Sequence, residues 1–257
     1  MSSEHKSNAK ARTGTTTSEL AFADAFEGFL KTHKGARAFP KLDGVYREVP
    51  GIQGVADFVG VRAPRWLQLS RRLHQQFHGV ARGPAAEIVC NLTRPRSREG
   101  LLAHSRYSRR LATLTLFQLV RSGVVRQSAN EVCRLSDTFR LPIFSLYFFE
   151  IKLSKWRRAV GQSLQAKLYA NKTYCVFPAG AERPILQHRT LFDALGIGVF
   201  FFDPARWKIV ESVRARISGS SRRAYSFDVL LRLAMLEHAQ SGVRLKGTKA
   251  RPKSLQN

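Results

Sequence analysis

The stretch FFEIKLSKWRRAVGQ, residues 148–162, decides how the rest of the sequence is interpreted. An apolar run ends in a carboxylate and an amine on alternate residues, Glu150 and Lys152, and continues into a basic amphipathic segment. If residues 146–153 form a strand, the two-residue period places both side chains on one face. There they could share a metal ion and a scissile phosphate. An ordinary surface ion pair is the alternative explanation.

The charge of the chain indicates a polyanionic partner. Its 257 residues include 43 Lys and Arg against 18 Asp and Glu, a formal net charge of +25. The basic residues run through the apolar segments as well as the ends, and such a surface attracts nucleic acid by counterion release and electrostatic steering. Charge alone does not exclude a protein that merely adheres to nucleic acid or to acidic lipid. The length allows one large domain or two modest ones.

The cysteines and apolar runs indicate where the protein works. Cys90, Cys133 and Cys175 are far apart and lack the spacing of a metal site. We therefore expect reduced, mostly buried thiols in a cytoplasmic protein, associated with the nucleoid if the source is bacterial. No signal-peptide core is apparent, and the longest apolar runs are far too short to span a bilayer, so we expect no membrane partner.

The two ends of the chain differ from the rest. Residues 1–18 and 245–257 are polar and basic, and we expect both to be disordered tails.

Residues 19–33, ELAFADAFEGFLKTH, predict a helix because apolar residues recur at helical spacing. Glu19 and Glu27 lie on or near this helix. We expect this helix to pack against the core of the protein. The alternative is that one of its carboxylates assists a metal ion or faces a phosphate.

Residues 44–62, GVYREVPGIQGVADFVGVR, predict a β-hairpin with strands at 45–49 and 55–61. Asp57 lies inside the second strand, where an acid is costly unless it is paired or binds a cation. A lone strand aspartate is more often salt-bridged than catalytic. The stretch at 148–162 nevertheless offers the carboxylate and the lysine that a metal site would need.

Glu48, on the first strand of the hairpin, is a further candidate metal ligand. Carboxylate oxygens are the ligands that Mg²⁺ prefers in proteins. A surface ion pair with Arg47 or Lys41 is an equally weighted alternative.

Residues 81–137 have the order of a winged helix-turn-helix. A first short helix is followed by a second one that Ser97 caps, then by a longer helix at 105–123. Two short strands around a polar turn would form the wing.

Arg106, Arg109 and Arg110 cluster at the start of the long helix, the end that enters a major groove in this arrangement. The alternatives are a core helix with a solvated arginine face and a winged helix that binds protein. The basic character of the whole chain favours DNA.

The second half of the chain alternates strands and helices. Residues 139–153 predict a strand, and the basic helix after it exposes Arg157 and Arg158 as candidate DNA-binding residues. The alternation predicts a mixed, at least partly parallel sheet. The later elements that we expect are a strand at 173–178, a helix at 185–195, a strand at 197–203 and a helix at 226–239 that Ser226 caps.

Asp57 in a strand, Glu150-Ile-Lys152 in a later strand, and a following helix with Gln162 resemble the PD-(D/E)xK nuclease superfamily. The resemblance implies an α/β (α+β) fold of the restriction-endonuclease-like type, a mixed central sheet flanked by helices. It further implies that Asp57 and Glu150 hold a divalent cation, Mg²⁺ or Mn²⁺, while Lys152 positions or activates the attacking water and Gln162 assists.

The resemblance also divides the chain. Residues 19–80 and 138–244 would form the nuclease-like core, with the winged helix-turn-helix of residues 81–137 inserted between them. In the family a short connection usually joins the aspartate to the later strand, whereas here the connection is long. We expect the insertion to dock the core on DNA.

The expected function is a metal-dependent DNA endonuclease that hydrolyses phosphodiester bonds, in DNA repair or in defence against foreign DNA. The alternative is a noncatalytic winged-helix DNA-binding protein or regulator on a nuclease-like scaffold. A toxin-like or RNA-directed nuclease would use the same residues. The sequence leaves open whether two copies of the chain form a homodimer.

Overall fold

The computed structural model describes residues 18–32, 39–51, 54–219 and 221–247. The tails that we expected to be disordered lie outside these ranges, except for residue 18 and residues 245–247. Residues 245–247 form the end of a helix.

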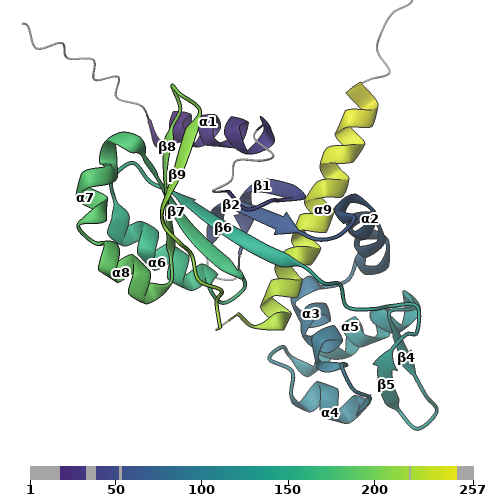
Figure 1. The fold of residues 1–257 in the computed structure, drawn as a ribbon. Coiled ribbons are helices and arrows are strands. Elements are labelled where there is room, and N and C mark those ends of the chain that lie inside the picture. Colours follow the sequence, from purple (N-terminus) through teal and green to yellow (C-terminus); the bar gives the residue numbers. More distant parts are fainter. Residues whose placement is uncertain (1–17, 33–38, 52–53, 220, 248–257) are drawn as a thin grey trace, which may run out of the picture.

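A six-stranded mixed sheet forms the centre of the molecule, in the order β1-β2-β6-β7-β8-β9 (Figure 1). Strands β6, β7 and β8 run parallel, and the other neighbours pair antiparallel. The expected hairpin and the mixed, partly parallel sheet are therefore confirmed. The strands span β1 Gly44–Pro50, β2 Val55–Arg62, β6 Ser145–Ile151, β7 Lys172–Pro178, β8 Gly198–Asp203 and β9 Lys208–Val213.

Helices cover both faces of this sheet because its strands carry apolar side chains on both sides. On one face, Phe22, Phe26 and Phe29 of helix α1 (Glu19–Thr32) pack against sheet residues that include Phe149 and Phe202. On the other face lie helices α6 (Trp156–Ala166), α7 (Glu182–Leu186) and α8 (Arg189–Leu195), with a short 3-10 turn at Ala179–Ala181 before α7.

A second unit lies between β2 and β6 in the chain. Its elements follow one another as helix, strand, helix, helix, strand, strand, and its three strands pair in the order β3-β5-β4. Ser97 caps the second helix by accepting a hydrogen bond from the N–H of Gly100, as expected. The elements are α3 Arg82–Asn91, β3 Arg96–Ser97, α4 Arg98–Ala103, α5 Arg109–Arg121, β4 Val125–Gln127 and β5 Val132–Leu135.

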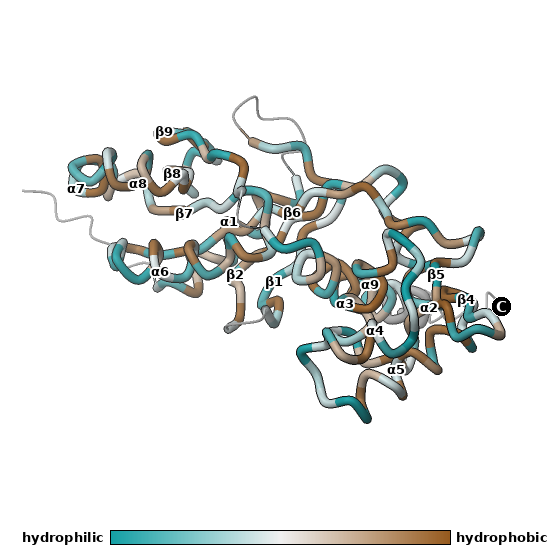
Figure 2. The backbone as a smooth tube through the Cα atoms, turned by 90° about the horizontal axis from the view of Figure 1, so that it is seen from below, coloured by the Kyte–Doolittle hydropathy of each residue, from teal (hydrophilic) through white to brown (hydrophobic). Residues whose placement is uncertain are grey.

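The long helix α9 (Arg223–Gly247) joins the two parts of the molecule. It packs against α2 (Trp66–Phe77), α3 and β1, and Figure 2 shows apolar segments of these elements gathered around it. One continuous apolar core includes Tyr46 of β1, Leu73 of α2 and Leu230 of α9. The inserted unit is therefore anchored on the sheet by buried packing.

Several expected boundaries were wrong. The strand expected from residue 139 begins at Ser145, since Pro142 has no N–H for a ladder. The helix expected from residue 105 begins at Arg109, because Ser108 caps it by accepting from the N–H of Leu111.

Two further helix assignments differ from those expected from the sequence. Residues 185–195 belong to two short helices instead of one, although the second ends at Gly196 in the left-handed conformation, as expected. Ser226 lies inside α9 and does not cap it, because its hydroxyl donates to the carbonyl of Tyr169.

Candidate active site at the end of β2 and β6

Two carboxylates lie side by side where β2 and β6 meet. The antiparallel register pairs Phe58 with Phe149, which places Asp57 beside Glu150 at the next step of the ladder. Asp57 Oδ2 accepts a hydrogen bond of 2.8 Å from the N–H of Ile151. Residues far apart in the chain are thus held together by strand pairing.

Lys152 follows directly after β6 and continues its extended path, since its N–H donates to the carbonyl of Val176 at 3.1 Å. The expected sharing of one face by Glu150 and Lys152 is observed: Nζ lies 2.7 Å from Glu150 Oε1. The same Nζ lies 3.5 Å from Asp57 Oδ2. The structure therefore brings together three of the four residues that the sequence indicated as catalytic.

Burial sets the electrostatics of this group. The side chain of Glu150 is 0% exposed, and among the described residues its carboxylate has no polar partner other than the Lys152 ammonium. Burial raises the pKa of Glu150 to about 7 and Asp57 adds to the rise, while Lys152 opposes it. Burial by itself lowers the pKa of Lys152, but the nearby carboxylates outweigh it and the net shift is upward.

Glu19 is a third carboxylate of the site. It is the first residue of α1, and its Oε1 lies 3.1 Å from Nζ of Lys152. From the sequence we expected this helix to serve packing, and a helix carboxylate at the site was only the alternative. The available signal was an acid at the start of a helix, which is also common for macrodipole reasons.

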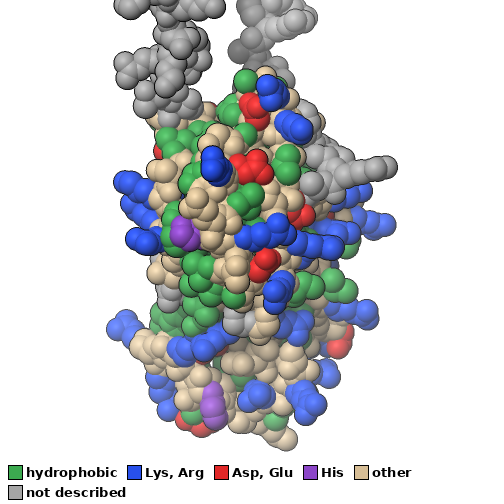
Figure 3. Space-filling view, turned by 60° about the vertical axis from the view of Figure 1, so that its left-hand side comes forward, with side chains coloured by type: hydrophobic (Ala, Val, Ile, Leu, Met, Phe, Trp, Pro, Cys, Tyr) green, Lys and Arg blue, Asp and Glu red, His purple; other side chains and the backbone are tan. Residues whose placement is uncertain are grey.

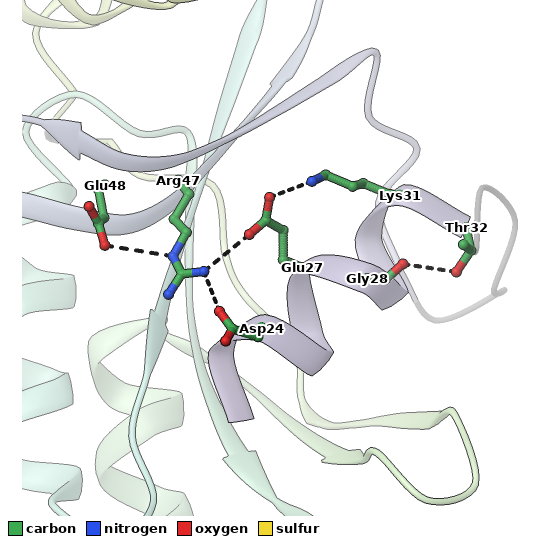
Figure 4. A network of polar contacts seen from close by, with 7 residues as sticks. All are labelled: Asp24, Glu27, Gly28, Lys31, Thr32, Arg47 and Glu48. Carbon is green, nitrogen blue, oxygen red and sulfur yellow. Dashed lines mark hydrogen bonds and ion pairs between the residues drawn. The ribbon is translucent and has the colours of Figure 1, made fainter. Parts of the chain in front are cut away.

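Glu48 points toward its neighbour Arg47 (Figure 4). It has a left-handed φ of 52°, and its exposed carboxylate pairs with Arg47, with Oε1 3.7 Å from Nε. Arg47 also pairs with Asp24 and Glu27 of α1. Within the described residues no contact joins Glu48 to Asp57 or Glu150, and the surface pair weighed against metal binding is the one observed.

Gln162 lies on α6 and lines a pocket of about 80 Å³ together with Ala56, Phe148 and Tyr169. Its Oε1 is buried and accepts no hydrogen bond from the residues that the structure describes. Ala56 lies on β2 and Phe148 on β6, so the pocket borders the two strands that carry Asp57 and Glu150. No contact within the described residues links Gln162 to Asp57, Glu150 or Lys152 directly.

The candidate DNA-binding arginines fall into two regions. Arg157 and Arg158 are exposed at the start of α6, and Arg157 stacks over Trp156 with Cζ 5.2 Å from the ring centroid. Arg109 and Arg110 are exposed at the start of α5, where Arg109 pairs with Glu99 at 2.6 Å.

Arg106, expected on the same helix, lies before it. Its Nε donates to buried Glu87 at 2.8 Å, and its guanidinium stacks over the ring of Tyr225. Burial by itself lowers the pKa of Arg106, but its hydrogen bond to Glu87 outweighs this and the net shift is upward. Arg106 therefore connects α3, α9 and the turn before α5.

The residues present can accommodate a divalent cation. In the described part of the chain no group of three or more His, Cys, Asp or Glu side chains is arranged as a metal site. Mg²⁺, however, is commonly bound through one or two carboxylates plus waters and substrate phosphates. The two buried oxygens of Glu150 lie beside Asp57 and have no partner among the described residues other than the Lys152 ammonium. They are suitable oxygen donors once Lys152 moves aside.

Comparison with protein families, with curated proteins and with solved structures found no match. Within the described residues, every helix is too short or too polar to cross a membrane.

Proposed function

We propose that this chain is a Mg²⁺- or Mn²⁺-dependent DNA endonuclease of the PD-(D/E)xK type, with a restriction-endonuclease-like core. The observation that carries the proposal is the meeting of Asp57, Glu150 and Lys152 at one end of the sheet, although 95 positions separate Asp57 from Lys152 in the chain. The order of α1, the β1-β2 hairpin, β6, α6 and β7 further supports it.

Each member of the group has a role in phosphodiester hydrolysis. Asp57 and Glu150 would hold the cation, which when bound stabilises negative charge on the phosphate. Lys152 would then place an ammonium beside the attacked phosphate and orient the water, whose oxygen forms a bond to phosphorus as the bond to the leaving sugar oxygen breaks. Exposed Arg157 and Arg158 would hold the neighbouring phosphates.

The test is cleavage of plasmid DNA by the purified full chain with Mg²⁺ or Mn²⁺. We expect nicking that EDTA abolishes and that Glu150→Ala or Lys152→Ala reduces by about 10²-fold or more. Glu182→Gln, which neutralises an exposed carboxylate on α7, is the control and should cleave normally. Metal-dependent cleavage that survives both active-site substitutions would refute the assignment.

The inserted unit supports DNA as the substrate. Its order of helices and strands is that of a winged helix, with α5 as the recognition helix and β4-β5 as the wing. Arg110 and Arg121 are exposed on α5 and form no ion pair with any described residue, so both are available to phosphates. Figure 3 shows Lys and Arg side chains scattered over the face of the molecule that it draws, among fewer acidic ones.

Arg110→Ala with Arg121→Ala is expected to weaken DNA binding and to flatten the slope of log affinity against log salt by about 0.9 for each phosphate that is no longer neutralised. Fluorescence anisotropy over a salt series measures both. Arg183→Ala, on exposed α7, removes one positive charge elsewhere and should change the affinity and the slope by less than half as much as the double variant. An unchanged slope in the α5 double variant would exclude this helix as the DNA-binding element.

Arg106→Ala should act differently from the α5 substitutions. It removes the guanidinium from the 6% exposed Glu87 carboxylate, which keeps the backbone N–H of residue 106 as a donor to Oε1 but loses the donor to Oε2, so we expect a loss of about 1–3 kcal/mol in the free energy of unfolding. Urea unfolding measures this loss. Stability equal to that of the wild type would show that the ion pair with Glu87 contributes little.

A noncatalytic DNA-binding protein or regulator is the second candidate. The observation that favours it is Lys152 itself, whose ammonium lies against both carboxylates. Salt-sensitive DNA binding with no cleavage under any divalent cation would support it. Parallel assays on RNA distinguish an RNA-directed nuclease, and sedimentation of the full chain tests the homodimer.

A further inference from the structure

The ammonium of Lys152 lies among three carboxylates from three elements. Its distances are 2.7 Å to Glu150, 3.1 Å to Glu19 and 3.5 Å to Asp57. Two of these carboxylates are the ones that would hold the divalent cation. The lysine thus supplies positive charge where the cation would supply it, and both cannot be closest to the same oxygens.

Lys152 has little freedom to leave this place by moving into solvent. Its side chain is 6% exposed, and its backbone N–H is bonded to β7. Removing a buried ammonium from two carboxylates without a new partner would be costly. The side chain of Glu19 is 49% exposed, against 33% for Asp57 and 0% for Glu150, and Glu19 comes from outside the β2-β6 pair.

Glu19 is also held firmly in place. It begins α1, and Phe22 and Phe26 of the same helix are 1% and 0% exposed against the sheet. Lys152 is the only cationic side chain with which Glu19 pairs among the described residues. Glu19 therefore offers Lys152 a fixed second partner at the rim of the site.

We infer that Glu19 is a positioning residue: it draws the Lys152 ammonium away from Asp57 and Glu150 so that a divalent cation can take its place. This inference rests on the proposed function, because it assigns the cation to those two carboxylates. Lys152 acts as a tethered competitor of the cation in the metal-free protein, and Glu19 lowers the cost of its displacement. Glu19 acts through Lys152 and does not itself bind the cation.

The test measures Mn²⁺ binding to the full chain by calorimetry or by electron paramagnetic resonance, without nucleic acid and hence without cleavage. Lys152→Met removes the competitor, and we expect Mn²⁺ to bind about tenfold more tightly or better. Glu19→Gln leaves the lysine without its second partner, and we expect about tenfold weaker binding. In the Lys152→Met background, Glu19→Gln should change the affinity by less than about twofold.

Asp24→Asn is the matched control, since Asp24 is an exposed carboxylate on the same helix and pairs with Arg47 instead of Lys152. It should leave the Mn²⁺ affinity close to that of the wild type. Thermal unfolding of every variant shows whether the fold is kept.

The outcomes separate the inference from the proposed function. Glu19→Gln that weakens Mn²⁺ binding equally with and without Lys152 would show a direct ligand and overturn the positioning role. Glu19→Gln without effect, or Lys152→Met that does not tighten binding, would also overturn it, while cleavage by the wild type would leave the nuclease proposal standing. Absence of both Mn²⁺ binding and cleavage in the wild type would overturn both.

Discussion

Asp57→Asn is expected to reduce metal-dependent cleavage by about 10²–10³-fold while the fold is retained. The substitution removes the negative charge that would hold the cation. It keeps an oxygen that can accept the hydrogen bond from the N–H of Ile151, which is 2.8 Å from Asp57 Oδ2. Rates of plasmid nicking at saturating Mg²⁺, together with urea unfolding, measure the two effects separately.

Asp57→Ala tests the charge and the hydrogen-bond acceptor of Asp57 together. It removes both the charge and the acceptor, so the Ile151 N–H is left without its partner and the protein should be destabilised by about 1–3 kcal/mol as well as inactive. Nicking by Asp57→Asn at the wild-type rate would contradict the catalytic assignment. Unfolding of Asp57→Asn would instead assign the carboxylate a structural role.

Phe26→Ala is expected to lower the free energy of unfolding by about 3–5 kcal/mol, the largest effect on stability that we expect. Phe26 is 0% exposed and lies at the centre of the contact between α1 and the sheet. Its ring contacts the rings of Phe29, Phe39, Phe58, Phe149 and Phe202. Truncation leaves a cavity that this close-packed cluster cannot fill without moving.

Phe117→Ala is the matched control, because Phe117 is 58% exposed on α5 and the same atoms are removed. It should change the free energy of unfolding by less than about 0.5 kcal/mol. Urea or thermal unfolding decides the comparison. Equal destabilisation of the two variants would contradict the position of α1 on the sheet, and with it the placement of Glu19.

Local sequence patterns predicted most elements because each has a signal within a few residues. The hairpin at residues 44–62 was predicted from two apolar runs around a turn, and its two strands pair antiparallel as expected. The β7 and β8 strands were predicted from β-branched and aromatic runs. Boundaries were wrong where one local signal competed with another. Residues 139–144 are mostly apolar, which favours a strand, but they contain Pro142 and pair with no described strand.

The candidate site was predictable only in part. Glu150 and Lys152 are two residues apart, so the strand period alone indicated a shared face. Their approach to Asp57 depends on the antiparallel pairing of β2 with β6, for which the sequence carries no local signal across the long insertion. The outward position of Glu48 depends on a left-handed backbone conformation that is uncommon for glutamate.

By itself the sequence determined the basic charge, the alternation of strands and helices, and the Glu150-Lys152 pair, since composition and short-range periodicity set these properties. Only the tertiary structure decided which distant side chains meet. Packing of the α1 phenylalanines brings Glu19 to Lys152, and a buried pair with Glu87 takes Arg106 away from the α5 helix. Both outcomes follow from burial against particular partners, which no local pattern specifies.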